Sequence, residues 1–210
     1  RVLDYVLNGF HSDVLHASVA ARIPTWYPDR HGYRSGALQA LADWPQESES
    51  TEVFFRALRD EDEWTQRAAA EALPKYAAGD TAIRDGLLAM IAQPCEPRGL
   101  AYALHSLCLG WPQHAKVPPL LAEARRSGDT TVATVATYHR VQRQEADQED
   151  RSFLLHLGHW QSGSPYHWRD DAALALAKGW PDDPEIKEMA LQALKDRLAH
   201  RRQLDAEFAS

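Results

Sequence analysis

The dipeptide Trp-Pro occurs three times, at Trp44, Trp111 and Trp180, at intervals of 67 and 69 residues. Around the last two, an apolar run rich in small residues reaches Gly-Trp-Pro and is followed by a second apolar run. Half of each interval is about 34 residues, and the midpoints fall on polar breaks at 75–80 and 143–148. Self-similarity at this period is the sequence signature of a solenoid built from helical repeats.

Each repeat divides into an alanine-rich helix and a more amphipathic partner. We expect the alanine-rich helices at 34–43, 64–76, 97–109, 130–143 and 168–179. We expect their partners at 51–60, 81–92, 117–128, 149–160 and 184–200. Apolar residues of the partners recur at helical spacing, for instance Ile83, Leu87, Leu88 and Ile91. No stretch alternates apolar and polar residues with a period of two, so the predicted fold class is all-α, an alpha-alpha superhelix of about five helix pairs.

The repeat pattern divides the chain into three parts. Residues 34–200 carry the repeats. Residues 1–33 fit the pattern poorly, and we expect there a degenerate N-terminal repeat or cap followed by a loop. Residues 201–210 form a C-terminal tail.

The small and aromatic residues of the repeat predict how the helices pack. Alanine on one face lets neighbouring helices approach closely, so that successive pairs share a continuous core. Trp44, Trp111 and Trp180 fall at the C-terminal ends of alanine-rich helices. A large ring there fills the gap at the helix turn, with its indole N–H directed outward. We therefore expect a packing role for all three tryptophans.

The composition excludes several classes of protein. The formal net charge of −7 argues against bulk binding of nucleic acid, which needs a basic surface to meet phosphates. No apolar run approaches membrane-spanning length, and we recognise no signal peptide. The two cysteines, Cys95 and Cys108, have no metal-binding or redox spacing, so the expected location is cytoplasmic.

An arginine opens most of the alanine-rich helices. These arginines are Arg34, Arg67, Arg98 and Arg169, and Val132 takes the place in the fourth unit. A basic ladder for phosphate or an acidic partner is one interpretation. The other, which we favour, is that each arginine pairs with the acidic turn before it or with a neighbouring repeat. Asp60, Asp62 and Glu63 form such a turn before Arg67.

The fourth unit departs from the pattern. It lacks the arginine, and its loop "QSGSPYHW" at 161–168 is longer than its counterparts. It also concentrates histidines, but His156 and His159 have no convincingly spaced third ligand, so we predict no metal site and no cofactor. A repeat that breaks the pattern is where a solenoid usually departs from scaffolding. The candidate partner-binding residues are Tyr138, Arg140, Trp160, Tyr166, His167 and Trp168.

Two stretches resemble known repeats. "DEDEWTQRAAAEALPKY" at 60–76 resembles the second helix of a HEAT-like repeat, with an acidic turn, an arginine and then small residues. "ALAKGWPDDPEIKEMALQAL" at 175–194 resembles the HEAT-like arrays C-terminal to the NTPase module of bacterial NACHT proteins, NLR-related STAND-type ATPases of anti-phage defence. The resemblance implies a HEAT/ARM-like solenoid that serves as a protein-recognition or scaffold module, as a sensor or regulatory segment.

The resemblance also implies no enzymatic activity of this segment. The chain contains no Walker A, GxGxxG, GxSxG or HExxH motif, so any ATPase would lie outside it. We expect a protein partner on the concave face or on the irregular fourth repeat, or an intramolecular contact with the NTPase module. We expect neither nucleic acid nor a membrane as partner.

Two other functions fit the repeat. "EWTQRAAAEALPKY", with Trp26 and Asp29 upstream, is similar to a HEAT-like DNA glycosylase of the alkylpurine type. Such an enzyme needs a basic concave face, whereas this chain is acidic. The second alternative is a HEAT-like lyase or chaperone that acts on a cofactor-bearing protein. Base release from alkylated DNA tests the former, and transfer of a bilin chromophore tests the latter.

Overall fold

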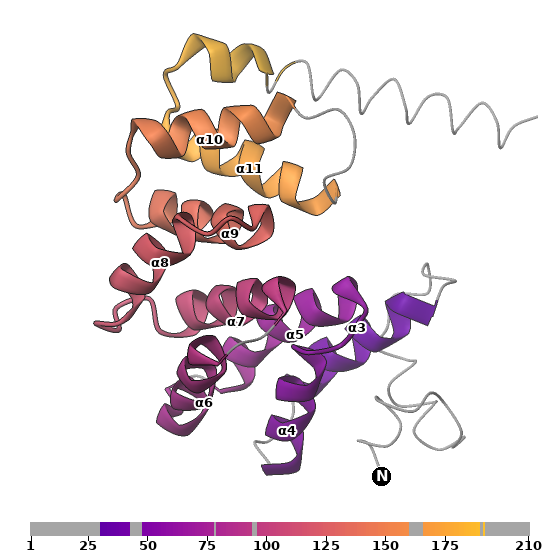
Figure 1. Cartoon of the computed structure of the whole chain (residues 1–210). Coiled ribbons are helices and arrows are strands. Elements are labelled where there is room, and N and C mark those ends of the chain that lie inside the picture. The colour runs from indigo at the N-terminus through magenta and orange to yellow at the C-terminus, as the bar shows by residue number, and fades with distance from the viewer. Residues whose placement is uncertain are drawn as a thin grey trace, which may run out of the picture. The chain divides into compact units, whose positions relative to one another are not determined.

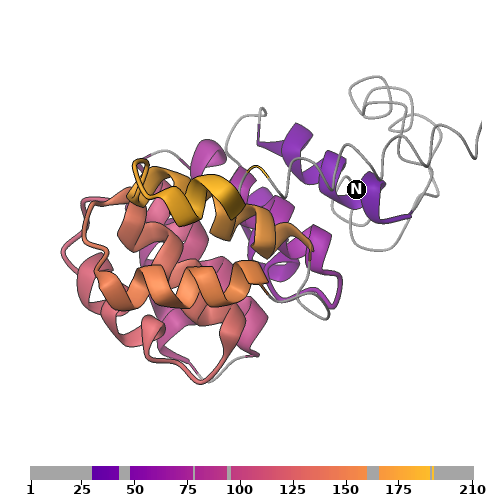
Figure 2. The same cartoon turned by 90° about the horizontal axis from the view of Figure 1, so that it is seen from above.

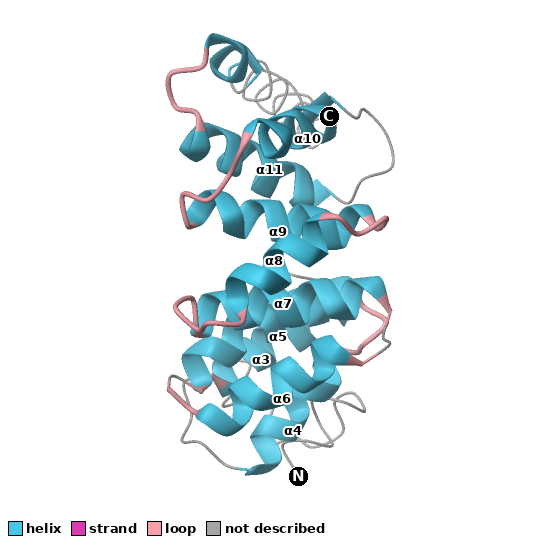
Figure 3. Ribbon diagram, turned by 60° about the vertical axis from the view of Figure 1, so that its left-hand side comes forward, coloured by secondary structure: helices cyan, strands magenta, loops and turns pink. Residues whose placement is uncertain are grey.

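The regular structure is entirely helical in the part of the chain that the computed structural model describes, residues 30–42, 48–77, 79–93, 96–159, 166–189 and 191 (Figures 1 and 3). The labelled helices are α3 (Arg30–Leu41), α4 (Ser48–Ala57), α5 (Glu63–Tyr76), α6 (Thr81–Ala92), α7 (Pro97–Gly110), α8 (Val117–Arg125), α9 (Thr130–Gln142), α10 (Gln148–His159) and α11 (Tyr166–Gly179). Residues 184–189 are also helical. The predicted all-α fold class is confirmed. None of the described helices is both long and apolar enough to cross a membrane.

The order of the helices follows the predicted alternation of two types. The bounds of most helices agree with the expected ones to within a few residues, and those of α6 agree at both ends. Because α3 begins at Arg30, the expected boundary at residue 34 falls inside a helix. Residues 1–29, which include most of the predicted cap, and the tail at 201–210 lie outside the described residues.

The chain forms two compact units, one ending at Ala136 and the other beginning at Thr137. In the first unit, α5 packs on both α3 and α7, while α4 packs on α5 and α6 on α7. Alanine-rich helices thus contact one another, and their amphipathic partners lie beside them, as the repeat predicts. Small side chains fill the contact faces of α5 and α7, among them the buried Ala68, Ala69, Ala72, Ala101 and Ala103.

In the second unit, α10 packs along α11 (Figure 2). The core of this unit draws on the end of α9, on α10 and α11, and on the helical segment after them. Its buried residues include Val141, Leu154, Leu157, Ala172, Leu176 and Ile186. Tyr138 and Trp180 pack against this core and are half-buried.

The two Gly-Trp-Pro turns have the same backbone hydrogen bonds. The Trp111 N–H donates to the Leu107 carbonyl at 2.9 Å, and the Trp180 N–H donates to the Leu176 carbonyl at the same distance. Three residues after each tryptophan, a backbone N–H donates back to the tryptophan carbonyl, at 3.0 Å in the first turn and 3.2 Å in the second. The repeated sequence therefore encodes a repeated helix end.

The tryptophans match the prediction only in part. Both Trp111 and Trp180 are half-buried at a helix end, as a packing role requires. The expected outward direction of the indole N–H is wrong for Trp111, because its Nε1 is buried and has no acceptor among the described residues. Trp44 lies outside the described part of the chain.

The arginines of the first unit form short-range ion pairs. Arg67 Nε lies 2.8 Å from Glu71 Oε1, one turn later in the same helix. Arg98 Nη2 lies 2.9 Å from Glu96 Oε1. The hydrogen bond to Glu96, and more weakly the charge of Glu63 on the neighbouring α5, raise the pKa of Arg98. The side chains of Arg34 and Arg169 lie outside the described residues.

Candidate functional site

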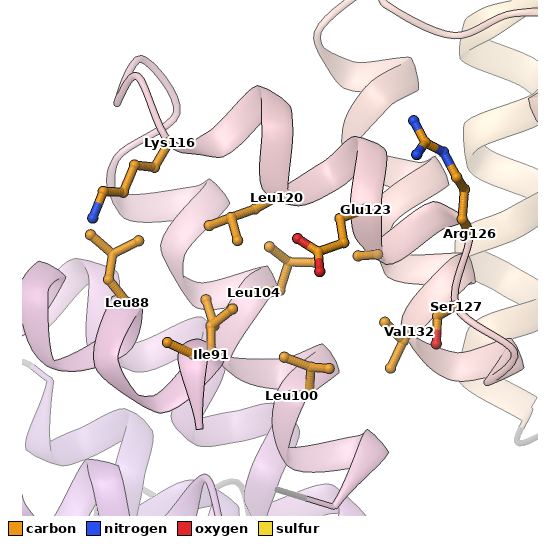
Figure 4. A pocket seen from close by; sticks show the side chains of 12 residues that line it. Leu88, Ile91, Leu100, Leu104, Lys116, Leu120, Glu123, Arg126, Ser127 and Val132 are labelled. Atoms are coloured by element: carbon orange, nitrogen blue, oxygen red, sulfur yellow. The ribbon is translucent and has the colours of Figure 1, made fainter. Parts of the chain in front are cut away.

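A groove of about 690 Å³ lies between α6 and α8 over α7, within the first unit (Figure 4). Its walls are largely aliphatic and come from all three helices. We call it the α6–α8 groove and define it by Leu88, Ile91, Leu100, Leu104, Leu120 and Glu123. Val132, at the start of α9, closes one end. An apolar groove of this size is a candidate binding site.

The wall on α6 exists because this helix is apolar on two faces. Ile83 and Leu87 are buried in the core, as their helical spacing predicts. Leu88 and Ile91, which belong to the same apolar series in the sequence, are half-buried and line the groove instead. The sequence therefore identifies these residues as apolar helix positions but does not separate the core face from the groove face.

The wall on α8 combines charged and apolar side chains. Val117 and Leu121 are fully buried and anchor α8 on the core. Lys116, Leu120 and Glu123 follow one another at spacings of four and three residues, so they share a different face of the helix, which borders the groove. This face presents a cation, an apolar side chain and a carboxylate in that order.

The charged groups of the groove have no intramolecular partner within the described structure. The side chains of Lys116, Glu123 and Arg126 form no ion pair and no hydrogen bond with any described residue. Lys116 extends toward Leu88 at one end, whereas the Glu123 carboxylate lies over the apolar floor beside Leu104 (Figure 4). Arg126 directs its guanidinium away from that floor. Lys116 and Glu123 are therefore available to a bound partner.

The candidate residue Arg140 is already engaged within the second unit. Its Nε lies 3.0 Å from Oδ2 of Asp150, whose side chain is fully buried. Its Nη2 donates to the Glu145 carbonyl at 2.8 Å and lies 3.2 Å from Asp147 Oδ2. Asp147 and Asp150 in turn accept each other's backbone N–H at the start of α10, which is a capping box. Arg140 thus ties the end of α9 to the start of α10.

Of the six predicted site residues, only Tyr138 and Arg140 have side chains in the described part of the chain. Tyr138 precedes Arg140 on α9 and packs partly into the core, with its ring 5.2 Å from the buried His139 ring in an edge-on arrangement. Trp160 lies outside the described residues. Tyr166, His167 and Trp168 form the first turn of α11, but their side chains lie outside the described part. The prediction that these six form one surface stays a prediction.

The histidines show no shared site where they are described. His139 is buried, whereas His156 on α10 is exposed. No group of three potential metal ligands occurs among the described residues. The histidine with a clearly altered pKa is His105 on α7. Burial lowers this pKa to about 4, and Glu71 and Arg67 have smaller, opposing effects on it.

Comparison of the chain with family models, with curated proteins and with solved structures gave no match.

Proposed function

We propose that this chain is a protein-recognition module that binds its partner in the α6–α8 groove. The observation that carries the proposal is the exposed apolar wall formed by three packed helices, with half-buried leucines and isoleucine where a finished core would cover them. Helix-lined grooves of this kind bind amphipathic segments of other proteins.

The proposal places this module in a larger protein. The resemblance of residues 175–194 to the arrays of NACHT-type defence ATPases supports a sensor or regulatory role, in which the groove binds either a foreign protein or a segment of the parent ATPase. In both cases the segment itself has no turnover, and its output is a change in binding.

A peptide selection tests the proposal. A library of displayed helical peptides is panned on the native protein, and the affinity of the enriched peptides is then measured for Leu120→Asp, which puts a charge into the groove wall. Leu109→Asp is the matched control, because Leu109 is 45% exposed on α7 and does not line the groove. We expect enriched peptides to bind the native chain and Leu109→Asp alike, and to lose at least tenfold in affinity for Leu120→Asp, about 1.4 kcal/mol.

The proposal is wrong if no peptide enriches, or if the enriched peptides bind Leu120→Asp as well as the native chain. Circular dichroism of each variant shows whether the helices are intact.

A further inference from the structure

The spacing of Lys116 and Glu123 on α8 sets the charge pattern of an occupant of the α6–α8 groove. Both border the groove, and seven residues separate them. Seven residues are two turns, or about 10 Å along a helix axis at 1.5 Å per residue. Leu120 lies between them on the same face. A docked helix that runs along α8 meets the cation, the leucine and the carboxylate in sequence.

The position of Glu123 discriminates between occupants. Its carboxylate lies over the apolar floor beside Leu104, and no described residue neutralises it (Figure 4). An apolar occupant would strip water from this carboxylate without replacing the lost hydrogen bonds, which is unfavourable. An acidic occupant or the phosphates of a nucleic acid would be repelled by it. A basic side chain at this point is therefore favoured.

Lys116 places the opposite requirement on the other end. Its ammonium extends toward Leu88, at the rim of the apolar wall of α6. A carboxylate of the occupant satisfies it there, while the stem of the lysine covers apolar surface.

The walls favour a helix as the element that carries these charges. Leu88 and Ile91 on α6 and Leu100 and Leu104 on α7 project at spacings of three and four residues. Such rows form the ridges and grooves into which the side chains of another helix pack.

We propose that the α6–α8 groove binds an amphipathic helix of a partner protein that carries an acidic and a basic side chain two turns apart, flanking its apolar stripe. The acidic side chain pairs with Lys116, and the basic one pairs with Glu123. This inference rests on the proposed function, because it specifies the partner of the same groove.

Two designed peptides test the charge pattern. Both are alanine-based helices with leucines at positions i+3 and i+4; one has glutamate at i and lysine at i+7, and the other has glutamine at both. The neutral peptide is the control, because a peptide with the two charges exchanged satisfies both by entering in the opposite direction. Fluorescence anisotropy of labelled peptide measures the affinity. We expect the charged peptide to bind about fivefold more tightly.

Variants of the protein assign this preference to α8. Glu123→Gln is expected to weaken the charged peptide about threefold and to leave the neutral one unchanged. Glu61→Gln is the matched control, since Glu61 is exposed before α5 and outside the groove. Glu123→Lys is expected to invert the preference, so that a peptide with glutamate at both positions binds at least tenfold better than the glutamate–lysine peptide.

The outcomes separate this inference from the proposed function. Equal binding of the charged and neutral peptides, lost in both cases with Leu120→Asp, overturns the charge pattern and leaves the groove as a binding site. If a purely aliphatic ligand also binds the native chain and loses its affinity with Leu120→Asp, and if the helical peptides bind no more tightly than this ligand, the helix as occupant is overturned. Absence of binding by either peptide, together with a failed selection on the groove, overturns both.

Discussion

At the scale of single residues, the glycines of the Gly-Trp-Pro turns set how closely alanine-rich helices approach. A Cβ on Gly110 would lie 3.2 Å from Pro74 Cβ, and a Cβ on Gly179 would lie 3.1 Å from Val141 Cγ1. Each contact joins the ends of two alanine-rich helices within one unit. Close packing of the two helices therefore explains the glycine, whereas the tryptophan after it fills the turn.

We predict that Gly110→Ala and Gly179→Ala each lower the free energy of unfolding by about 1 kcal/mol. Overpacking of this kind costs about 1–3 kcal/mol, and the better helix propensity of alanine offsets part of it. Urea denaturation measures the change. In a chain that already carries Val141→Ala, Gly179→Ala should no longer destabilise, because Val141→Ala deletes the methyl groups that oppose the new Cβ. Gly128→Ala is the control, since no atom lies within 4 Å of its Cβ position. Equal effects of all three glycine substitutions would contradict the packing role.

His105 predicts a stability that depends on pH. Its pKa is about 4 in the folded chain against 6.5 as the ordinary value, so the unfolded state binds the proton first. The stabilisation that neutral His105 gives to the folded chain is complete above pH 6.5 and is lost as the pH falls toward 4. Between these limits we expect the native chain to lose up to about 3 kcal/mol more than His105→Gln, by about 1.4 kcal/mol per pKa unit. Urea denaturation of both proteins across this range measures the difference, and parallel curves would show that His105 is solvated.

At the scale of elements, the end of α9 differs from the other alanine-rich helices. The Glu145 N–H donates to the Arg140 carbonyl at 2.9 Å, and the Gln144 N–H donates to the Val141 carbonyl at 3.0 Å. Gln144 has a φ of 59°, in the left-handed region. This pattern is a Schellman motif with glutamine in the position that glycine usually takes. The fourth unit therefore ends its alanine-rich helix differently from α5 and α7.

We predict that Gln144→Gly stabilises the chain by about 0.5–1 kcal/mol. A left-handed residue with a Cβ costs about 1–2 kcal/mol, and the greater entropy of unfolded glycine returns part of this gain. Thermal unfolding followed by circular dichroism measures the effect. Gln39→Gly on α3 is the control, because it introduces the same residue at an exposed position inside a helix and should destabilise. A lower melting temperature for Gln144→Gly would contradict the assignment.

The sequence predicts the elements better than it predicts their faces. Period and composition place the helices because helix formation depends on local spacing and small residues. Whether Leu88 faces the core or a groove depends on how far α8 lies from α6, and no local pattern contains that distance. The register of the arginines was also misleading: the equivalent helix ends at Ala77 and Trp111 align Arg67 with Ala101 rather than with Arg98.

The candidate site shows the same limit. Arginine is a residue type that is common in binding sites, but the guanidinium of Arg140 pairs with Asp147 and Asp150 at the start of α10. The groove residues Lys116 and Glu123 are two charged residues on either side of Leu120 on one helix face, a pattern that the sequence alone does not distinguish from a solvated face.

At the scale of the whole molecule, the charges of the chain neutralise one another locally. Acidic side chains exceed basic ones, 30 to 23. Many of the described arginines pair with a carboxylate, either a few residues away or on a later segment of the same unit. These arginines are Arg56, Arg67, Arg84, Arg98, Arg140, Arg143 and Arg151. An external polyanion would therefore have to compete with carboxylates for these seven arginines of the described part.

We therefore predict that duplex DNA does not bind this chain more tightly than about 100 µM at physiological salt, the weak limit of non-specific binding. Non-specific affinity comes from lysine and arginine side chains that replace counterions along the phosphate backbone. Here the paired arginines would first have to leave carboxylates that lie about 3 Å away, and the net charge of −7 opposes the approach. Fluorescence anisotropy of a labelled duplex, with and without an alkylated base, measures this directly. Micromolar binding that weakens steeply with added salt would revive the glycosylase alternative, whereas its absence leaves the α6–α8 groove, with one cation and one carboxylate two turns apart, as a surface suited to protein.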